Sequence, residues 1–262
     1  MSETRTEPVL IRADWPAPPG VHAVVTTRYG GISVSPFDQL NLATHVGDDP
    51  AAVTENRARL KTHAGLPSEP RWLNQVHGLV VADACGPDGA SDVLPDADAG
   101  YTDQTQVVLS VLTADCLSVV FCSRDGRELA VAHAGWRGLA AGVLAATIAR
   151  FNAAPAEMMA WIGPAIGPQA FEVGGEVRSA FVDTHAEDEA GFTTGRDPGK
   201  YQANLFVLAR LSLQRAGIRH IFGGGICTFS DPARFYSYRR DAGRTGRMAT
   251  LVWRTDDASR SA

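Results

Sequence analysis

Three side chains that can bind a metal or carry out nucleophilic chemistry stand apart from the rest of the sequence. Cys116 comes directly before one apolar run, His133 ends another, and His77 lies in a short motif where nothing in the local pattern demands a histidine. Each of them, taken alone, is equally typical of a packed structural side chain. A thiolate and an imidazole held together act either as a nucleophile pair or as two ligands of a soft to borderline metal. With His77 as a third ligand, a zinc ion would keep one open position, as catalytic zinc sites do.

The two apolar runs beside Cys116 and His133 are predicted to pair as a β-hairpin. Residues 123–126 separate the runs, and the glycine at the end of this segment accepts the positive φ that a type I turn with a bulge requires. A turn in which Ser123 faces Gly126 places Cys116 directly opposite His133, with Cβ atoms about 5 Å apart. A bulge would shift this register, but the hypothesis needs only proximity.

The surrounding elements mix helices and strands without a regular βαβ rhythm. Asp48, Asp49 and Pro50 supply a cap and a first turn for a helix that ends at Gly65. Further helices are predicted over 136–151, 174–182 and 204–216, and extended segments over 107–112, 117–121, 129–133, 218–222, 235–238 and 250–253. This mixture predicts an α+β fold with α/β layering, in which helices cover a mixed, largely antiparallel sheet. We expect a single compact catalytic domain over 14–255, between a flexible N-terminus (1–13) and a flexible tail (256–262).

The composition excludes several classes of protein. With 262 residues, of which 45% are hydrophobic, the chain can bury a sizeable core. A net charge of -5 argues against a nucleic-acid partner, and no apolar run is long enough to cross a bilayer. Four cysteines make no disulfide framework in a chain of this length, so a reducing compartment is expected. The sequence therefore predicts a cytoplasmic protein with neither a membrane nor a nucleic acid as its partner, and leaves its oligomeric state open.

Motifs along the chain resemble, in order, the signatures of the YfiH-like, laccase-domain family, whose older name is multicopper polyphenol oxidase-like. The match runs over roughly residues 20–253, and its central motifs are highly specific and contain the three residues above. The fold that this resemblance implies is similar to the cysteine-hydrolase domain of a bacterial deamidating toxin. The motifs lie at 26–33, 40–42, 46–50, 74–78, 113–117, 132–138, 162–168 and 236–241.

The resemblance implies a zinc-dependent enzyme that acts on purine nucleosides. It matches His77, Cys116 and His133 to the zinc ligands, one ion per chain, and Arg28 to an arginine that meets phosphate. The implied activities are phosphorolysis of adenosine or inosine, and by extension methylthioadenosine, to the base and ribose 1-phosphate, together with adenosine deamination. A small nucleoside and phosphate are thus the expected partners.

Chemistry assigns roles to further residues. Phosphorolysis needs a held phosphate, and the planar fork of Arg28 suits bidentate binding of that anion. Asp115, beside the thiolate, is either a proton carrier or a hydrogen-bond acceptor at a strand end. We therefore predict Cys116, Asp115 and Arg28 as catalytic residues. The predicted residues for binding substrate or phosphate are Arg28, Asn41, Gln75, Arg137 and Arg239.

Three alternative functions use the same residues or the same family name. In a hydrolase that edits peptidoglycan precursors, Cys116 would be the nucleophile and His133 the base. A copper oxidoreductase of the laccase type is disfavoured, because no His-X-His pair occurs among the seven histidines. A zinc-stapled binding module would need a fourth, closing ligand, and the other cysteines lack CxxC partners. The remaining histidines in the N-terminal and C-terminal parts, His22, His45, His63 and His220, are predicted to be structural.

Overall fold

The structure is a computed structural model that describes residues 9–84 and 95–256. Most strands form two sheets, and a small third sheet lies to one side. A four-stranded antiparallel sheet has the order β1 (Leu10–Arg12), β2 (Val21–Thr26), β13 (Met248–Arg254), β5 (Leu109–Thr113). A six-stranded mixed sheet has the order β12 (His220–Gly223), β8 (Met158–Ile162), β6 (Leu117–Ser123), β7 (Leu129–Ala134), β4 (Ala99–Thr102), β3 (Val81–Asp83). The three-stranded sheet has the order β10 (Phe192–Thr194), β11 (Lys200–Ala203), β9 (Glu172–Gly174).

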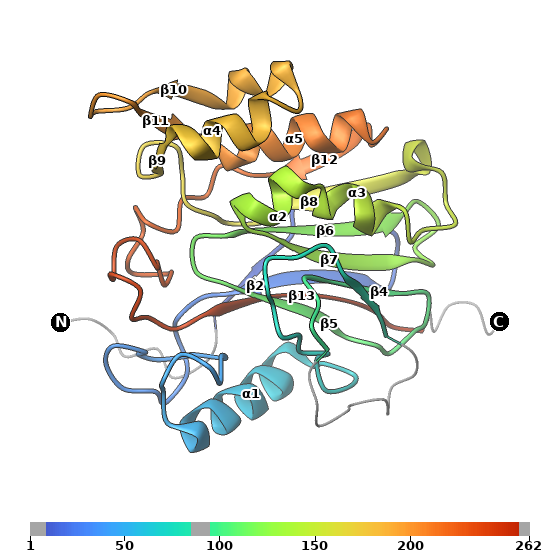
Figure 1. The fold of residues 1–262 in the computed structure, drawn as a ribbon. Helices are drawn as coiled ribbons and strands as arrows, with labels where there is room; N and C mark the ends of the chain where they lie inside the picture. The colour runs from blue at the N-terminus through green and yellow to red at the C-terminus, as the bar shows by residue number, and fades with distance from the viewer. Residues whose placement is uncertain (1–8, 85–94, 257–262) are drawn as a thin grey trace.

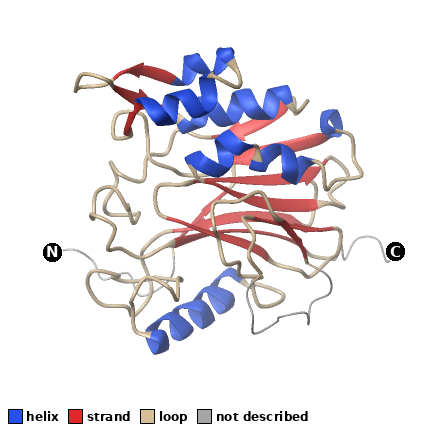
Figure 2. Cartoon of the chain, viewed as in Figure 1, coloured by secondary structure: helices blue, strands red, loops and turns tan. Residues whose placement is uncertain are grey.

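The two large sheets lie face to face and helices cover their outer sides (Figures 1 and 2). On the outer side of the four-stranded sheet lies α1 (Pro50–Ala64). The outer side of the six-stranded sheet carries α2 (Trp136–Ala141), α3 (Val143–Ile148), α4 (Gly175–Val182) and α5 (Leu205–Arg215), with short 3-10 helices at Pro155–Glu157 and Ala186–Gly191. The predicted α+β class is confirmed, with the difference that the strands divide among three sheets.

Alternating side chains along the strands fill the space on either side of each sheet. On β6, Val119 and Phe121 pack toward the helices, whereas Val120 packs against the four-stranded sheet. On β13, Val252 packs between the sheets and Leu251 packs on the side of α1. Each of these side chains is almost completely buried, which stabilises the fold by about 1.5–3 kcal/mol apiece. This period of two is what a strand between two apolar layers requires.

Helix α1 begins and ends where its sequence predicts. The carboxylate of Asp49 accepts a hydrogen bond from the amide of Ala51, and Pro50 occupies the first turn. Gly65 ends the helix with a φ of 60°, in the left-handed region that glycine enters without strain. On the buried face of α1, Asn56 accepts from the amide of Ile32 and donates to the carbonyl oxygen of Asn41. The helix therefore fixes the loop that precedes it.

The β6–β7 hairpin forms, but its predicted register is wrong. Gly126 has the expected positive φ of 74°, yet Ser123 pairs with Glu128 instead of Gly126. The turn is therefore longer than the predicted one, and His133 lies opposite Ser118. Cys116 consequently lies just before β6, outside the ladder.

Other predicted elements also change. The helix over 136–151 is broken at Gly142, which has a φ of 100° and separates α2 from α3. Residues 235–238 are irregular, and β1 lies inside the segment predicted to be flexible. The predictions for residues 1–8 and 257–262 lie outside the described residues, and the domain bounds stay a prediction. Among the described residues, no helix has the length and apolar character that a membrane span needs.

Candidate metal centre and its cavity

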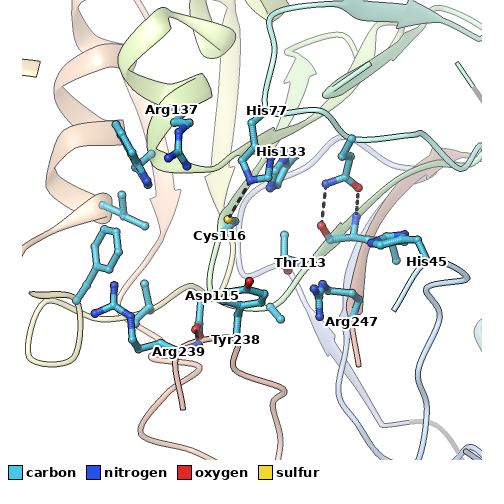
Figure 3. Close-up of a pocket in the computed structure, with 17 residues that line it drawn as sticks. His45, His77, Thr113, Asp115, Cys116, His133, Arg137, Tyr238, Arg239 and Arg247 are labelled. Atoms are coloured by element: carbon cyan, nitrogen blue, oxygen red, sulfur yellow. Dashed lines mark hydrogen bonds between the residues drawn. The ribbon is translucent and has the colours of Figure 1, made fainter. Parts of the chain in front are cut away.

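The three predicted ligands come together at one end of the two sheets. Strand β5 belongs to one sheet and β6 to the other, so residues 114–116 cross between them in a tight turn that places Asp115 at a φ of 85°. Cys116 ends this turn, and His133 lies near the end of the adjacent β7. Figure 3 shows His77 and His133 converging on Cys116. The ligand atoms of the three residues all lie within 4.8 Å of one another, and 3.9 Å separates Cys116 Sγ from His77 Nε2.

A buried carboxylate, Asp98, organises the two histidines. Its side chain is 0% exposed, and Oδ1 lies 2.7 Å from Nδ1 of His133. The same carboxylate accepts hydrogen bonds from the backbone amides of Val76, His77 and Gly78. Because Asp98 occupies Nδ1 of His133, the other ring nitrogen remains for a metal. One carboxylate thus orients His133 and holds the segment that carries His77.

Gly135 makes the close approach of these side chains sterically feasible. A Cβ atom at this position would lie 2.7 Å from Cδ2 of His77 and 3.1 Å from Sγ of Cys116. His77 itself has a φ of 61°, so its backbone is held in the left-handed region by the amide contacts to Asp98. The compact geometry therefore depends on a glycine and on one strained residue.

The electrostatics of the cluster favour a thiolate beside an imidazolium when no cation is bound. Burial alone would raise the pKa of Cys116, but hydrogen bonds and charge from His133 and His77 outweigh burial and lower the pKa to about 6. Burial alone would lower the pKa of His133, whereas hydrogen bonds to Asp98 and Cys116 raise it to about 9. The pKa of Asp98 is lowered, because its hydrogen bonds outweigh the burial that would raise it.

The donor set fits a divalent metal of borderline softness. Two imidazole nitrogens and a thiolate sulfur are the ligands that zinc and similar ions prefer. In residues 9–84 and 95–256, this is the only cluster of three or more such side chains placed to hold an ion. Three protein ligands leave a coordination position open, and they face a cavity of about 440 Å³. The arrangement is therefore that of an open metal site rather than a closed structural one.

The cavity has an apolar wall and several cationic side chains. Trp136 and Phe171 contribute aromatic rings, and the guanidinium groups of Arg137 and Arg239 lie over these two rings at 4.4 and 5.4 Å from the centroids. Figure 3 shows these arginines on one side of Cys116, with Arg247 and His45 on the opposite side. The remaining lining residues are His45, Gln75, His77, Leu112, Thr113, Ala114, Asp115, Cys116, His133, Ile166, Leu205, Tyr238 and Arg247.

Not every predicted site residue lines this cavity. Gln75, Arg137 and Arg239 do, although both ends of the Gln75 amide are already bonded to the backbone of Leu112. Arg28 is not among the residues that line this cavity, and its contact with phosphate stays a prediction. Its guanidinium donates to the carboxylate of Asp38 and to two carbonyl oxygens, and lies 4.9 Å from the ring centroid of Tyr236. Arg28 therefore ties loops together outside the cavity.

Asn41 and Asp115 each accept a hydrogen bond from the backbone of an arginine that lines the cavity. Asn41 is completely buried, does not line the cavity and accepts a hydrogen bond from the amide of Arg247. Asp115 lines the cavity, but its carboxylate accepts from the hydroxyls of Thr228 and Ser237 and from the amide of Arg239. These contacts favour the interpretation of Asp115 as a hydrogen-bond acceptor over its role as a proton carrier.

Sequence reasoning missed four residues of the site. Asp98 lies between two alanines of a buried strand start, and a carboxylate in such a position signals a bonded partner. His45 was predicted to be structural, but it lines the cavity, as do Arg247 and Tyr238. His45 and Arg247 come from loops that no periodicity marks, and Tyr238 lies in the 236–241 motif, in a segment predicted to be extended that is irregular in the structure. Only the fold brings these residues to Cys116.

Comparisons with known proteins place most of the chain in one family. A family model described as multi-copper polyphenol oxidoreductase laccase matches residues 22–255. A purine nucleoside phosphorylase of Pseudomonas aeruginosa is 54% identical over 243 residues, which cover 93% of this chain and 97% of that protein. The purine nucleoside phosphorylase YfiH of Escherichia coli is 51% identical over 244 residues, which cover 93% of this chain and 98% of that protein.

Solved structures share the fold. The crystal structure of a Neisseria meningitidis protein superposes with a TM-score of 0.89 and 48% sequence identity, covering 94% of this chain and 99% of that one. The crystal structure of YlmD from Geobacillus stearothermophilus superposes with a TM-score of 0.85 and 34% identity, covering 98% of each chain. The resemblance found in the sequence motifs is thus confirmed.

The substitution Asp98→Asn tests the role of the buried carboxylate. Both carboxylate oxygens of Asp98 accept hydrogen bonds from N–H groups. In either orientation of the asparagine side chain, its NH2 group would therefore face N–H donors and lose these bonds. We expect metal affinity to fall about 10- to 100-fold, as for other residues that orient a metal ligand. Competition against a chelator with elemental analysis measures this. The control is Asp96→Asn, an exposed residue that accepts from Asn74; equal affinities for the two variants would contradict the assignment.

The pKa of Cys116 predicts an unusual alkylation profile for the metal-free protein. The thiolate reacts and the thiol does not, so alkylation by iodoacetamide should rise as the pH passes about 6 and level off above about pH 7. Cys122 is buried and burial raises its pKa to about 12, so it should stay unmodified as an internal reference. Peptide mapping by mass spectrometry follows each cysteine separately. A midpoint near the ordinary thiol value, about 8.5, would refute the thiolate pair.

Proposed function

We propose that this chain, which belongs to the family described as multi-copper polyphenol oxidoreductase laccase, is a zinc-dependent purine nucleoside phosphorylase that also deaminates adenosine. Its substrates would be adenosine or inosine, by extension methylthioadenosine, and inorganic phosphate, within the cytoplasm. The observation that carries this proposal is the open His77–Cys116–His133 cluster facing a cavity with both an aromatic wall and free cations. The names of the relatives from Pseudomonas aeruginosa and Escherichia coli support the same activity.

The aromatic end of the cavity suits the purine. Trp136 and Phe171 offer flat apolar surfaces, and Arg137 and Arg239 lie over them. A guanidinium can donate two parallel hydrogen bonds to the N7 and O6 acceptors of a 6-oxopurine such as hypoxanthine. Such donors also stabilise the negative charge that grows on the base as its glycosidic bond breaks. We propose that these two arginines bind the leaving base.

The metal ligands of the site are proposed to be His77, Cys116 and His133. When bound there, zinc supplies a Lewis acid at the centre of the cavity, which suits both leaving-group activation and deamination. The chain itself contributes the orientation: Asp98 fixes the ring of His133, and the crossing turn fixes Cys116. Asp115 holds the backbone of Arg239 and so keeps that arginine at the purine.

The copper chemistry in the family description finds little support in the donor set. A multicopper cluster needs many imidazoles, and of the seven histidines only His45, His77 and His133 line the cavity. Among the described residues, the cluster that could hold a metal ion consists of His77, Cys116 and His133 and does not include His45. We therefore propose zinc over copper. The same cluster leaves a position open to the cavity, so the closed, zinc-stapled binding module is also disfavoured.

A cysteine hydrolase acting on peptidoglycan precursors is the second candidate. The lowered pKa of Cys116 beside His133 is the observation that favours it, since a thiolate next to an imidazolium is the active form of such a nucleophile. The two candidates make opposite predictions for the metal. A metal-bound thiolate is a blunted nucleophile, so zinc would inhibit the hydrolase and support the phosphorylase.

Cys116→Ala and His77→Ala test the proposed function. Each removes one of three ligands, so we expect both variants to lose zinc and phosphate-dependent cleavage of inosine together. The measurement is release of hypoxanthine and ribose 1-phosphate from a nucleoside panel, with zinc quantified in the same samples. His63→Ala, an exposed residue of α1, is the control and should retain both. Full turnover by either ligand variant, or activity that rises on chelation, would overturn the proposal.

A further inference from the structure

Three arginines line the cavity and none of them pairs with a carboxylate of the described residues; among them, only Arg247 is half-buried. Arg247 is half-buried and lines the cavity, and its Nη1 donates to the carbonyl oxygens of Thr245 and Gly246. Within residues 9–84 and 95–256 no carboxylate pairs with this guanidinium, and Nε and Nη2 have no protein acceptor. Outside the cavity, Arg28 pairs with Asp38 and Arg215 pairs with Asp188. A partly desolvated guanidinium with unused donors is arranged for an anion that the protein does not itself supply.

The backbone around Arg247 is built to hold this residue in place. The amide of Arg247 donates to Oδ1 of Asn41, and its carbonyl oxygen accepts from the amide of Leu42. Asn41 is completely buried, and its Nδ2 is fixed by Asp48 and by the carbonyl oxygen of Ala43. Asn41 is therefore a positioning residue for Arg247, which explains why a motif residue that was expected to bind substrate does not reach the cavity.

Arg57 raises the positive potential at this end of the cavity, and His45 adds an imidazole that can donate a hydrogen bond. His45 lines the cavity beside Arg247, and burial, together with the charges of Arg247 and Arg57, lowers the pKa of His45, so its imidazole is neutral near pH 7. Arg57 lies behind this end, where it donates to the carbonyl oxygen of Leu42 and stacks on Trp72. Burial lowers the pKa of Arg247, and the charges of Cys116 and Asp115 oppose this effect. The thiolate belongs to the metal site, and Asp115 is engaged by three donors.

The position of this end relative to the metal ligands suits a phosphate that attacks a nucleoside. His45 and Arg247 lie on one side of Cys116, and Arg137 and Arg239 lie on the other (Figure 3). In phosphorolysis the nucleophile approaches the anomeric carbon from the face opposite the leaving base. If the purine occupies the aromatic end, the ribose lies near Cys116 and the phosphate lies at the end of Arg247.

We propose that Arg247 and His45 form the oxyanion subsite of the cavity and bind inorganic phosphate, with Arg247 as its bidentate donor. This inference rests on the proposed function for the role of phosphate as a co-substrate, but not for the binding of the anion itself. In the reaction, a phosphate oxygen forms the new bond to the anomeric carbon while the glycosidic bond breaks and its electron pair leaves with the purine. Arg247 holds the remaining phosphate oxygens during this exchange.

The test compares Arg247→Gln with Arg59→Gln, an exposed helix residue paired with Glu55. Binding of inorganic phosphate to the zinc-loaded protein is measured by titration calorimetry, and KM for phosphate and for inosine is measured separately. We expect Arg247→Gln to weaken phosphate binding and raise the phosphate KM about 10- to 100-fold, with the inosine KM changed less than about threefold. Arg59→Gln should change neither quantity.

Two further variants keep the proposal falsifiable if Arg247→Gln is unstable. Arg247→Lys keeps the charge but loses the fork, so phosphate binding should weaken by less than in Arg247→Gln. His45→Gln should raise the phosphate KM without loss of zinc. Unchanged phosphate binding in folded Arg247 variants would overturn the subsite. If phosphate binds to the wild type and is lost in Arg247→Gln, but no nucleoside is cleaved, the subsite stands and the proposed function fails.

Discussion

The candidate site depends on one buried carboxylate, that of Asp98. It accepts hydrogen bonds from Nδ1 of His133 and from three backbone amides. A buried carboxylate is costly unless every oxygen is bonded, and here the partners are the groups that the site must hold still. The interaction links β4, β7 and the segment before β3 at one point. A single satisfied charge therefore serves both the stability of this corner and the orientation of two metal ligands.

The crossing between the sheets explains why such a cluster forms here. Each large sheet is a regular apolar layer, but the chain must pass from β5 to β6 within residues 114–116. So short a crossing demands a positive φ at Asp115 and leaves Cys116 outside the ladder, where its side chain is free of the strand alternation. Gly135 then permits His77 to approach. The His77–Cys116–His133 cluster thus forms where the regular hydrogen bonding of the sheets ends. The packed layers on both sides keep its side chains in place.

Sequence patterns predicted what local physics controls. The cap of Asp49, the stop at Gly65, the α5 helix begun by Asn204 and the β6–β7 hairpin all follow from short-range signals. The register of that hairpin did not, because the turn type alone leaves the loop length open and tertiary contacts of Glu128 decide it. The proximity of Cys116 and His133 survived this error, since the ends of neighbouring strands meet regardless of register. The ion pair of Arg28 with Asp38 was not predictable, because the motif around Arg28 gives no information on which carboxylate the fold brings to it.

The arginines at the two ends of the cavity differ in how far they are exposed to water. At its aromatic end, the exposed Arg137 and Arg239 lie over the rings of Trp136 and Phe171. Because these guanidinium groups remain partly hydrated, a neutral base can bind beside them. Its other end holds a half-buried arginine whose charge is not cancelled by a carboxylate of the described chain, so a dianion gains more there than at the hydrated end. The His77–Cys116–His133 cluster lies between them. This gradient of hydration, more than the number of arginines, makes the two ends of the cavity on either side of the cluster chemically different.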